Sequence, residues 1–515
     1  MNTSDWISRK VSKLLPASGA RRQGAAGAAG TEPARVKAAD PDAMHGLVET
    51  RRGDIVTAGS SAAARAQASS RTTSERLVGT LRRKGETMSP RTLRHTLGEL
   101  RAVVDERVSE VEGGRRASVF SQWYAAATPA ERRDCWLLMS EQFVADPQVI
   151  KLAQTRFAAA VGTPDEAVAE VQYRRATVSP RLRLLQRFSA FSQGVRFLVD
   201  LRAEMLQHLK ADPRLQALDV EMEYMFSTWF DVGFLDLRRI SWDSPASLIE
   251  KLIKYEAVHD IKSWADVKNR LDSDRRCYGF FHPRLPDDPL IFVEVALLHE
   301  IAAGITPLLD ESAAVEDLNK ATTAIFYSIS NTQAGLRGVS FGDSLIKRVV
   351  ETLKLEFPRL KTFATLSPIP GFRSWLGKNA AAMLDQLEDK ARAELSTEMG
   401  PEGVTAAQLL LGADRALELD VKSPLRRMLL RCAAYYLSRA LVDGKPVDPV
   451  ARFHLGNGAR IERLNWAGDP SSKGMKQSCG MMVNYLYDLK RLDRYRANLL
   501  QGKVPASAGI EEFLK

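Results

Sequence analysis

The sequence predicts an α+β protein, with an N-terminal all-α helical bundle domain followed by an α/β domain that contains helical insertions. Large apolar residues in the segment 72–235 recur at spacings of three and four, which is typical of helices. After residue 236, short apolar runs of strand length alternate with helical patterns. Large apolar side chains are scarce before residue 72. We therefore divide the 515 residues into segments 1–71, 72–235 and 236–515.

The first segment, 1–71, is rich in Ala, Gly, Ser and Arg. Such a composition cannot bury enough apolar surface to offset chain entropy, so we expect this segment to be disordered. An N-terminus rich in Arg, Ser and Ala is also typical of mitochondrial transit peptides, which are poor in acidic residues. Six acidic residues argue against that interpretation: Asp5, Glu32, Asp40, Asp42, Glu49 and Asp54.

The overall composition excludes several classes of protein. Lys and Arg total 73 against 63 Asp and Glu, a net charge of +10 without a long basic run, so we expect no nucleic-acid partner. A mild basic excess still favours an anionic small molecule such as a coenzyme. The chain has no apolar stretch long enough to span a membrane. Its four cysteines form no CxxC pair and its histidines form no HExxH motif, so we expect neither a disulfide framework nor a metal site.

The helical segment 72–235 contains one long apolar stripe and no constellation of chemically active residues. The stripe predicts one buried helix, formed by Leu184, Leu185, Phe188, Phe191, Val195, Leu198 and Val199. We interpret this segment as a helical bundle used for packing or oligomerisation.

The segment 236–515 contains four apolar runs of strand length, namely "CYGFF", "LIFVEVALL", "AIFYSIS" and "TFATLSPIP". Residues 324–370 follow the order strand, glycine-containing loop, helix, strand, which predicts a βαβ unit with a parallel strand pair. A further helix is expected to start at Ser423 and Pro424, which are typical cap and first-turn residues.

The loop in "SNTQAGLRGVSFGDSLIKRVV" has the features of a pyrophosphate cradle. Glycines let a ligand approach the backbone, and a helix N-terminus offers free N–H groups. The spacing resembles the acyl-CoA-binding loop R/Q-x-x-G-x-G/A of the GNAT acyltransferases, with Ser340 in place of the middle glycine. Glycine turns also occur for structural reasons alone. The candidate coenzyme-binding residues are Arg337, Gly338, Val339, Ser340, Phe341, Gly342 and Asp343.

Ser367 and His454 are the candidate catalytic residues. Ser367 lies where a strand ends, between rigid prolines, and the carboxyl ends of strands line the ligand crevice of α/β sheets. It belongs to no GxSxG motif, and a hydroxyl that only satisfies a turn is the alternative. His454 precedes a Gly-Asn-Gly turn, so we expect it in a structured loop and not on an apolar helix face. A packed histidine without a catalytic role is the alternative there.

Four strings, taken in order, closely resemble the malonyl-CoA decarboxylase family: "AIFYSISNTQAGLRGVSFGDSLIKRVV", "FATLSPIPGF", "FHLGNGARIERLNW" and "SCGMMVNYLYDL". The resemblance covers residues 72–500 and implies a GNAT-like catalytic domain that converts malonyl-CoA to acetyl-CoA and CO2. It implies no metal, biotin or nucleotide cofactor, and self-association through the helical domain as a dimer or tetramer. Ser367 and His454 match the family's catalytic pair, and Arg337 to Asp343 match its CoA loop. Animal members carry an acidic residue at Ser340.

The resemblance leads to a mechanistic hypothesis. His454 donates the proton that the enolate needs after CO2 leaves, and a histidine that titrates near neutrality suits that task. Ser367 anchors the malonyl carboxylate or relays the proton, while Asn457 and Tyr487 supply further polar contacts. The alternatives are a GNAT-type acyltransferase and a non-catalytic acyl-CoA-binding protein. We expect the bacterial cytoplasm as the location, with the mitochondrion as the alternative.

Overall fold

The computed structural model describes residues 87–339, 345–400 and 404–515. The predicted disorder of residues 1–71 therefore concerns residues outside the described ranges. The same holds for the predicted coenzyme contacts of Ser340, Phe341, Gly342 and Asp343.

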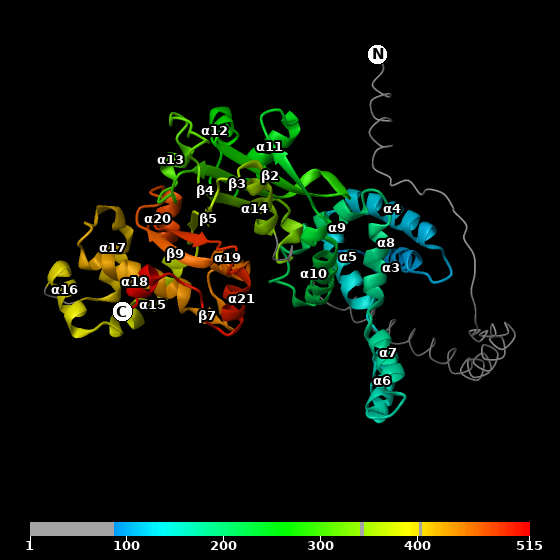
Figure 1. The fold of residues 1–515 in the computed structure, drawn as a ribbon. Coiled ribbons are helices and arrows are strands. Elements are labelled where there is room, and N and C mark those ends of the chain that lie inside the picture. Colours follow the sequence, from blue (N-terminus) through cyan, green and yellow to red (C-terminus); the bar gives the residue numbers. More distant parts are fainter. Residues whose placement is uncertain (1–86, 340–344, 401–403) are drawn as a thin grey trace, which may run out of the picture. The chain divides into compact units, whose positions relative to one another are not determined.

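The first part of the described chain is helical, as predicted (Figure 1). Its helices are α3 (Pro90–Val103), α4 (Glu110–Ala126), α5 (Pro129–Gln142), α6 (Pro147–Ala160), α7 (Glu166–Thr177), α8 (Pro180–Ser189), α9 (Gly194–Met205) and α10 (Gln216–Trp229). Ser89, Ser109 and Thr128 cap α3, α4 and α5 by accepting a hydrogen bond from a first-turn N–H. Trp136, Phe188 and Phe226 are fully buried in the core that these helices share.

The prediction of one continuous helix for the stripe of residues 184–199 is wrong. The stripe is divided between α8 and α9, and residues 190–193 form a tight turn that closes with a 2.9 Å bond from Gly194 N–H to the Phe191 carbonyl. Both helices face the same core, so the apolar spacing continues across the break.

The second part is built on an eight-stranded mixed sheet with the order β1-β2-β3-β4-β5-β10-β6, in which β9 also pairs with β10. The strands are β1 (Asp236–Ile240), β2 (Arg275–His282), β3 (Leu285–Leu298), β4 (Thr323–Asn331), β5 (Thr362–Thr365), β6 (Ser367–Pro368), β9 (Arg460–Asn465) and β10 (Met482–Leu486). The strand pairs are antiparallel except for β4 and β5.

The parallel pair β4–β5 separates before β4 ends. α14 (Leu345–Glu356) connects the two strands, which confirms the predicted βαβ unit. Their register runs from Thr323 opposite Thr362 to Phe326 opposite Thr365, whereas β4 continues to Asn331. A register shift in the β3–β4 ladder lies at the same point. A bulge of this kind bends a strand away from its neighbour, so β4 diverges from the strand that carries Ser367.

Further helices accompany the sheet: α11 (Ala246–Tyr255), α12 (Trp264–Arg270), α13 (Thr306–Leu309), α15 (Phe372–Asp385), α16 (Asp389–Met399), α17 (Ala406–Asp414), α18 (Pro424–Ser438), α19 (Pro449–Gly456), α20 (Ser472–Ser478), α21 (Leu492–Leu500) and α22 (Ala508–Glu512). The short strands β7 (Leu441–Val442) and β8 (Lys445–Pro446) form a separate hairpin. This arrangement of a helical region followed by a mixed sheet confirms the α+β class. The GNAT-like description and the domain limits 72–235 and 236–515 stay predictions.

None of the helices that the structure describes is both long enough and apolar enough to cross a membrane.

Candidate active site

His454 lies in the last turn of α19 and not in a loop as predicted. The N-cap residue Asp448 accepts hydrogen bonds from the N–H groups of Val450 (3.0 Å) and Ala451 (2.9 Å), and Pro449 occupies the first helical position. These are standard helix-start signals. The helix is short enough that its apolar pattern gave no periodic signal, which explains the wrong prediction.

Ser367 opens β6, which pairs antiparallel with β10 through Ser367 and Val483. Its hydroxyl donates a 2.8 Å hydrogen bond to Oγ1 of Thr365, two residues earlier on the chain. The Thr365 oxygen also accepts the backbone N–H of Tyr485 at 3.1 Å. Thr365 thus fixes the direction of the Ser367 hydroxyl, and it was not among the residues proposed from the sequence.

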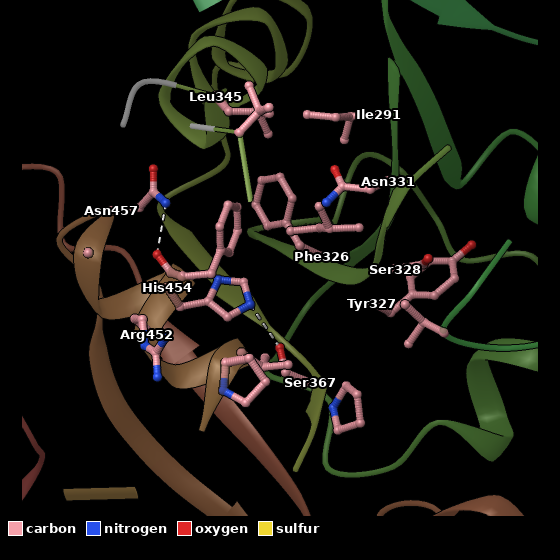
Figure 2. A pocket seen from close by; sticks show the side chains of 18 residues that line it. Ile291, Phe326, Tyr327, Ser328, Asn331, Leu345, Ser367, Arg452, His454 and Asn457 are labelled. Carbon is pink, nitrogen blue, oxygen red and sulfur yellow. Dashed lines mark hydrogen bonds between the residues drawn. The ribbon is translucent and has the colours of Figure 1, made fainter. Parts of the chain in front are cut away.

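Ser367, His454 and Tyr487 form one buried chain of hydrogen bonds. Ser367 Oγ lies 3.2 Å from His454 Nε2, as the dashed line in Figure 2 shows, and His454 Nδ1 lies 2.7 Å from the Tyr487 hydroxyl. The imidazole also stacks on the ring of Tyr485, with centroids 4.7 Å apart. Because the Ser367 proton points to Thr365, its oxygen is free to accept Nε2–H, while Nδ1 accepts the Tyr487 O–H.

The electrostatics of this chain differ from the expectation of a histidine that titrates near neutrality. Burial lowers the pKa of His454 to about 3, because the charged imidazolium would lose its hydration. Burial also raises the pKa of Tyr487 well above its ordinary value. The imidazole and the phenol are therefore both neutral at physiological pH.

A pocket of about 710 Å³ opens onto Ser367 and His454, where β4 diverges from β6 (Figure 2). One wall is the end of β4, from Phe326 to Asn331, and the other is the surface of α19. Apolar side chains dominate the lining, among them Val258, Ile291, Phe326, Ile329, Leu345, Pro368, Val450 and Phe453. A largely apolar pocket with a few convergent polar groups is typical of a binding site for a small organic ligand.

The pocket brings together four of the sequence-proposed residues, namely Val339, Ser367, His454 and Asn457. Tyr487 lies behind His454 and lines a separate cavity of about 130 Å³, which it shares with Asn457. Asn457 donates to the Phe453 carbonyl at 2.8 Å, and its buried Oδ1 has no partner among the described residues. Asn457 thus contributes to the walls of both cavities.

Arg337 and Gly338 are exposed beside the pocket, and the helical region holds the turn that contains them. The buried guanidinium of Arg202 in α9 donates to the carbonyls of Gly335 (2.8 Å) and Arg337 (2.9 Å), and it pairs with Asp219 at 2.8 Å. Gly338 has a φ of +84°, a conformation that favours glycine. The start of the glycine loop is thus held by Arg202, a residue outside the sheet that no sequence pattern singled out.

Within the described residues, no group of three or more His, Cys, Asp or Glu side chains is placed to hold a metal ion. The expectation of a reaction without metal, biotin or nucleotide cofactor stays a prediction.

A buried acid–base side chain, hydrogen-bonded on both nitrogens and facing a ligand-sized pocket, is the arrangement expected of an enzyme active site. Comparisons with known proteins identify the class. Residues 233–515 match the family described as "Malonyl-CoA decarboxylase C-terminal domain", and residues 143–230 match its N-terminal domain.

Individual relatives agree with the family match. The mitochondrial malonyl-CoA decarboxylase of Anser anser anser is 36% identical over 422 residues, which cover 78% of this chain and 83% of the relative. The mitochondrial malonyl-CoA decarboxylase of Rattus norvegicus is 41% identical over 340 residues, which cover 62% of this chain and 68% of the relative.

Solved structures agree as well. The crystal structure of malonyl-CoA decarboxylase from Rhodopseudomonas palustris has 39% identity and a TM-score of 0.70, and the match covers 83% of this chain and all of that one. The crystal structure of malonyl-CoA decarboxylase from Cupriavidus metallidurans has 43% identity and a TM-score of 0.67, and the match covers 82% of this chain and all of that one. The chain therefore belongs to the malonyl-CoA decarboxylase family, and it is a carboxy-lyase.

Proposed function

We propose that this enzyme converts malonyl-CoA to acetyl-CoA and CO2, with His454 as the proton donor to the enolate and Ser367 as its polar partner. The observation that carries the proposal is the 3.2 Å contact between Ser367 Oγ and His454 Nε2 at the wall of an acyl-sized pocket. The names of the relatives, all malonyl-CoA decarboxylases, support the choice of substrate.

The apolar lining favours the loss of CO2. A carboxylate placed among side chains such as Phe326 and Val450 loses hydration, whereas the charge that develops on leaving is spread over the enolate and the thioester oxygen. Because the Ser367 hydroxyl hydrogen points to Thr365, the donor that this pair can offer to the substrate is His454 Nε2–H. A preorganised donor aimed at a developing oxyanion typically contributes about 3–4 kcal/mol.

The enolate must then gain a proton at its α-carbon. Because Nδ1 accepts from Tyr487, the neutral imidazole carries its hydrogen on Nε2, on the pocket side. Transfer of this proton to carbon leaves a negative charge on the imidazole ring. The hydrogen bond from the Tyr487 hydroxyl to Nδ1 stabilises that charge. In this proposal Tyr487 acts on His454 and makes no contact with the substrate.

The coenzyme is proposed to bind at residues 337–343, ahead of α14. The support is the glycine pattern of the sequence ahead of that helix and the adjoining pocket wall at Val339 and Leu345. From there the pantetheine arm would follow the divergence of β4 and β6 to Ser367.

An acyltransferase that works through Ser367 as a nucleophile is disfavoured by the same geometry, whereas direct transfer to an external acceptor is tested by the assay below. A serine nucleophile needs a histidine base whose imidazolium is stabilised, usually by a buried carboxylate. Here the third group is a neutral phenol, and the pKa of His454 is about 3. His454 is therefore poorly suited to accept the Ser367 proton.

One assay separates the three functions. Purified protein is incubated with malonyl-CoA and no acceptor, and the products are followed by mass spectrometry. Release of acetyl-CoA and CO2 is the expected result, lost in His454→Ala and strongly reduced in Ser367→Ala. Product formation only after an acceptor is added would establish a transferase, and binding without CO2 release would establish a sensor.

A second experiment tests the coenzyme loop. Gly338→Val places a β-branched residue at a φ of +84°, and the strain should displace the loop. The KM for malonyl-CoA should rise at least fivefold while the fold is retained. An unchanged KM would argue against a coenzyme site at 337–343. Gly162→Val, also at positive φ but in the helical region, is the matched control.

We also propose self-association through the helical region. α6 and α7 pack on each other as a hairpin and bury only Ala153 and Ala169, while Val149, Leu152, Val168 and Val171 are largely exposed. Light scattering of the purified chain should give a dimer or tetramer. Leu152→Glu together with Val168→Glu should shift it towards monomer.

A further inference from the structure

The carboxylate of Asp448 is buried completely, and no ion pair between it and any described Lys or Arg is present. Burial raises its pKa, as expected for an acid without a compensating cation. Such a group is costly to retain, so its hydrogen-bond partners indicate why this position holds an acid. The partners belong to three segments of the chain.

The first segment is α19, which carries His454. Asp448 Oδ1 accepts the N–H groups of Val450 at 3.0 Å and Ala451 at 2.9 Å. It therefore fixes the first turn of a helix only two turns long, and His454 lies in the turn that follows.

The other segments approach Oδ2. The Tyr436 hydroxyl of α18 donates to Oδ2 at 3.2 Å, and the backbone N–H of Gly371 also interacts with the carboxylate. Gly371 follows Ser367 by four residues, through Pro368 and Pro370, which restrict the path of the chain. A Cβ at Gly371 would lie 2.2 Å from the Tyr436 hydroxyl and 3.8 Å from Oδ2, so this segment packs directly against the pair.

We propose that Asp448 is a positioning residue, which sets the distance between Ser367 and His454 by holding the segment after Ser367 and the helix of His454 on its two carboxylate oxygens. The inference rests on the proposed function for its kinetic consequences only. The structural part of the inference is that one carboxylate holds two catalytic segments in place, and this part does not depend on the identity of the substrate.

Asparagine distinguishes this role from simple helix capping. Asn and Asp are nearly equal as N-cap residues, so Asp448→Asn preserves the cap. However, Asn has one acceptor oxygen where Asp has two. If the oxygen of the new asparagine accepts from α19, the amide NH2 group takes the place of Oδ2. It then faces the backbone N–H of Gly371, which is a donor and cannot become an acceptor. The Tyr436 hydroxyl can rotate and accept from the amide instead.

Asp448→Asn should therefore lower kcat about 10- to 100-fold with KM within threefold, because a displacement of about 1 Å at reacting groups costs on the order of 10²-fold. Tyr436→Phe, which removes one donor and keeps the ring, should lower kcat less. Ser179→Ala is the matched control, since Ser179 caps α8 in the helical region. It should lower the melting temperature without changing kcat.

Crystal structures provide a readout independent of activity. The distance from Ser367 Oγ to His454 Nε2 should exceed 3.2 Å in Asp448→Asn. Wild-type kcat and distance in this variant, with Asp448→Ala merely less stable, would reduce Asp448 to a helix cap and overturn the inference. An equal loss of kcat in Ser179→Ala, or a rise in KM alone, would overturn it as well. If the wild-type protein releases no CO2 from malonyl-CoA, the proposed function is refuted. If the distance from Ser367 Oγ to His454 Nε2 is nevertheless longer in Asp448→Asn, the inference still holds.

Discussion

Two buried polar clusters, one at β3 and the other at β6, are built on opposite electrostatic principles. In the first, Arg270 and Glu294 are fully buried and 3.0 Å apart, and Asp266 pairs with the same guanidinium at 2.7 Å. In the second, Ser367, His454 and Tyr487 are equally buried but carry no charge at neutral pH. The β3–β4 register connects the two, because Glu294 is opposite Ser328, which lines the pocket.

The difference shows where this protein places fixed charge. The ionic cluster ties α12 to β3 and lies outside the described pocket lining. The pocket itself offers neutral donors near Ser367. Arg452 is the one charged side chain in the described lining, and its Nε donates to the Pro446 carbonyl at 3.0 Å. The following predictions test this contrast, in order of expected effect.

His454→Ala should reduce kcat by a factor of about 10²–10⁴, the usual contribution of a positioned proton donor. The free energy of unfolding at pH 7 should also fall, by about 2–5 kcal/mol, because the variant leaves a cavity where the buried imidazole stacks on Tyr485. Steady-state kinetics and urea unfolding measure the two quantities. A variant that keeps wild-type kcat would remove His454 from the mechanism.

Arg270→Met should lower the stability of the fold more than kcat, because Arg270 lies outside the described pocket lining. It leaves Glu294 and Asp266 buried without their cation, which typically costs about 3–5 kcal/mol of stability. Urea unfolding measures this loss, and Arg174→Met, from an exposed pair with Glu170, is the matched control with little expected change. If Arg270→Met unfolds no more easily than the control, the cluster is not a structural ion network.

The pH dependence of the free energy of unfolding should report the low pKa of His454. Its folded pKa of about 3 is below the ordinary value of 6.5, so between these values the unfolded chain binds a proton that the folded chain does not. Stability from this group is therefore lost as the pH falls below 6.5, by about 2 kcal/mol at pH 5. Urea unfolding of wild type and His454→Gln at pH 7 and pH 5 should show a smaller acid loss in the variant. Equal losses would contradict the low pKa.

Tyr487→Phe should have the smallest effect. It removes one hydrogen bond to Nδ1, worth about 1 kcal/mol, so kcat should fall several-fold to tenfold. KM should stay unchanged, because Tyr487 lines the smaller cavity and not the pocket. A rise in KM with constant kcat would instead place Tyr487 against the substrate.

The sequence was sufficient where local patterns dominate. The order of β4, α14 and β5 follows from the apolar spacing and the glycines between them. Ser367 was found because it follows an apolar run of strand length, although in the structure it opens β6. His454 was singled out by the Gly-Asn-Gly turn that follows it, and the resemblance supplied its catalytic role. Its helix was missed although Asp448-Pro449 is a start signal.

Long-range features could not be read from the sequence. Nothing local indicates that β10 lies between β5 and β6, that Asp448 reaches Gly371, or that Arg202 holds the glycine loop. These contacts join residues separated by more than 70 positions, and they are decided by packing. The burial that makes His454 neutral is equally a property of the folded core, so its pKa could not be anticipated.

The central place of β10 has a consequence for biosynthesis. More than a hundred residues separate Ser367 from Val483, its partner in the finished sheet. At about 5–20 residues per second, a ribosome needs on the order of 5–20 s to bridge that interval. Until then β5 and β6 present unpaired edges, the kind of surface on which nascent chains aggregate. The yield of active enzyme in a cell should therefore depend on chaperones that shield this edge during elongation, and slowing translation between α15 and α20 should lower it.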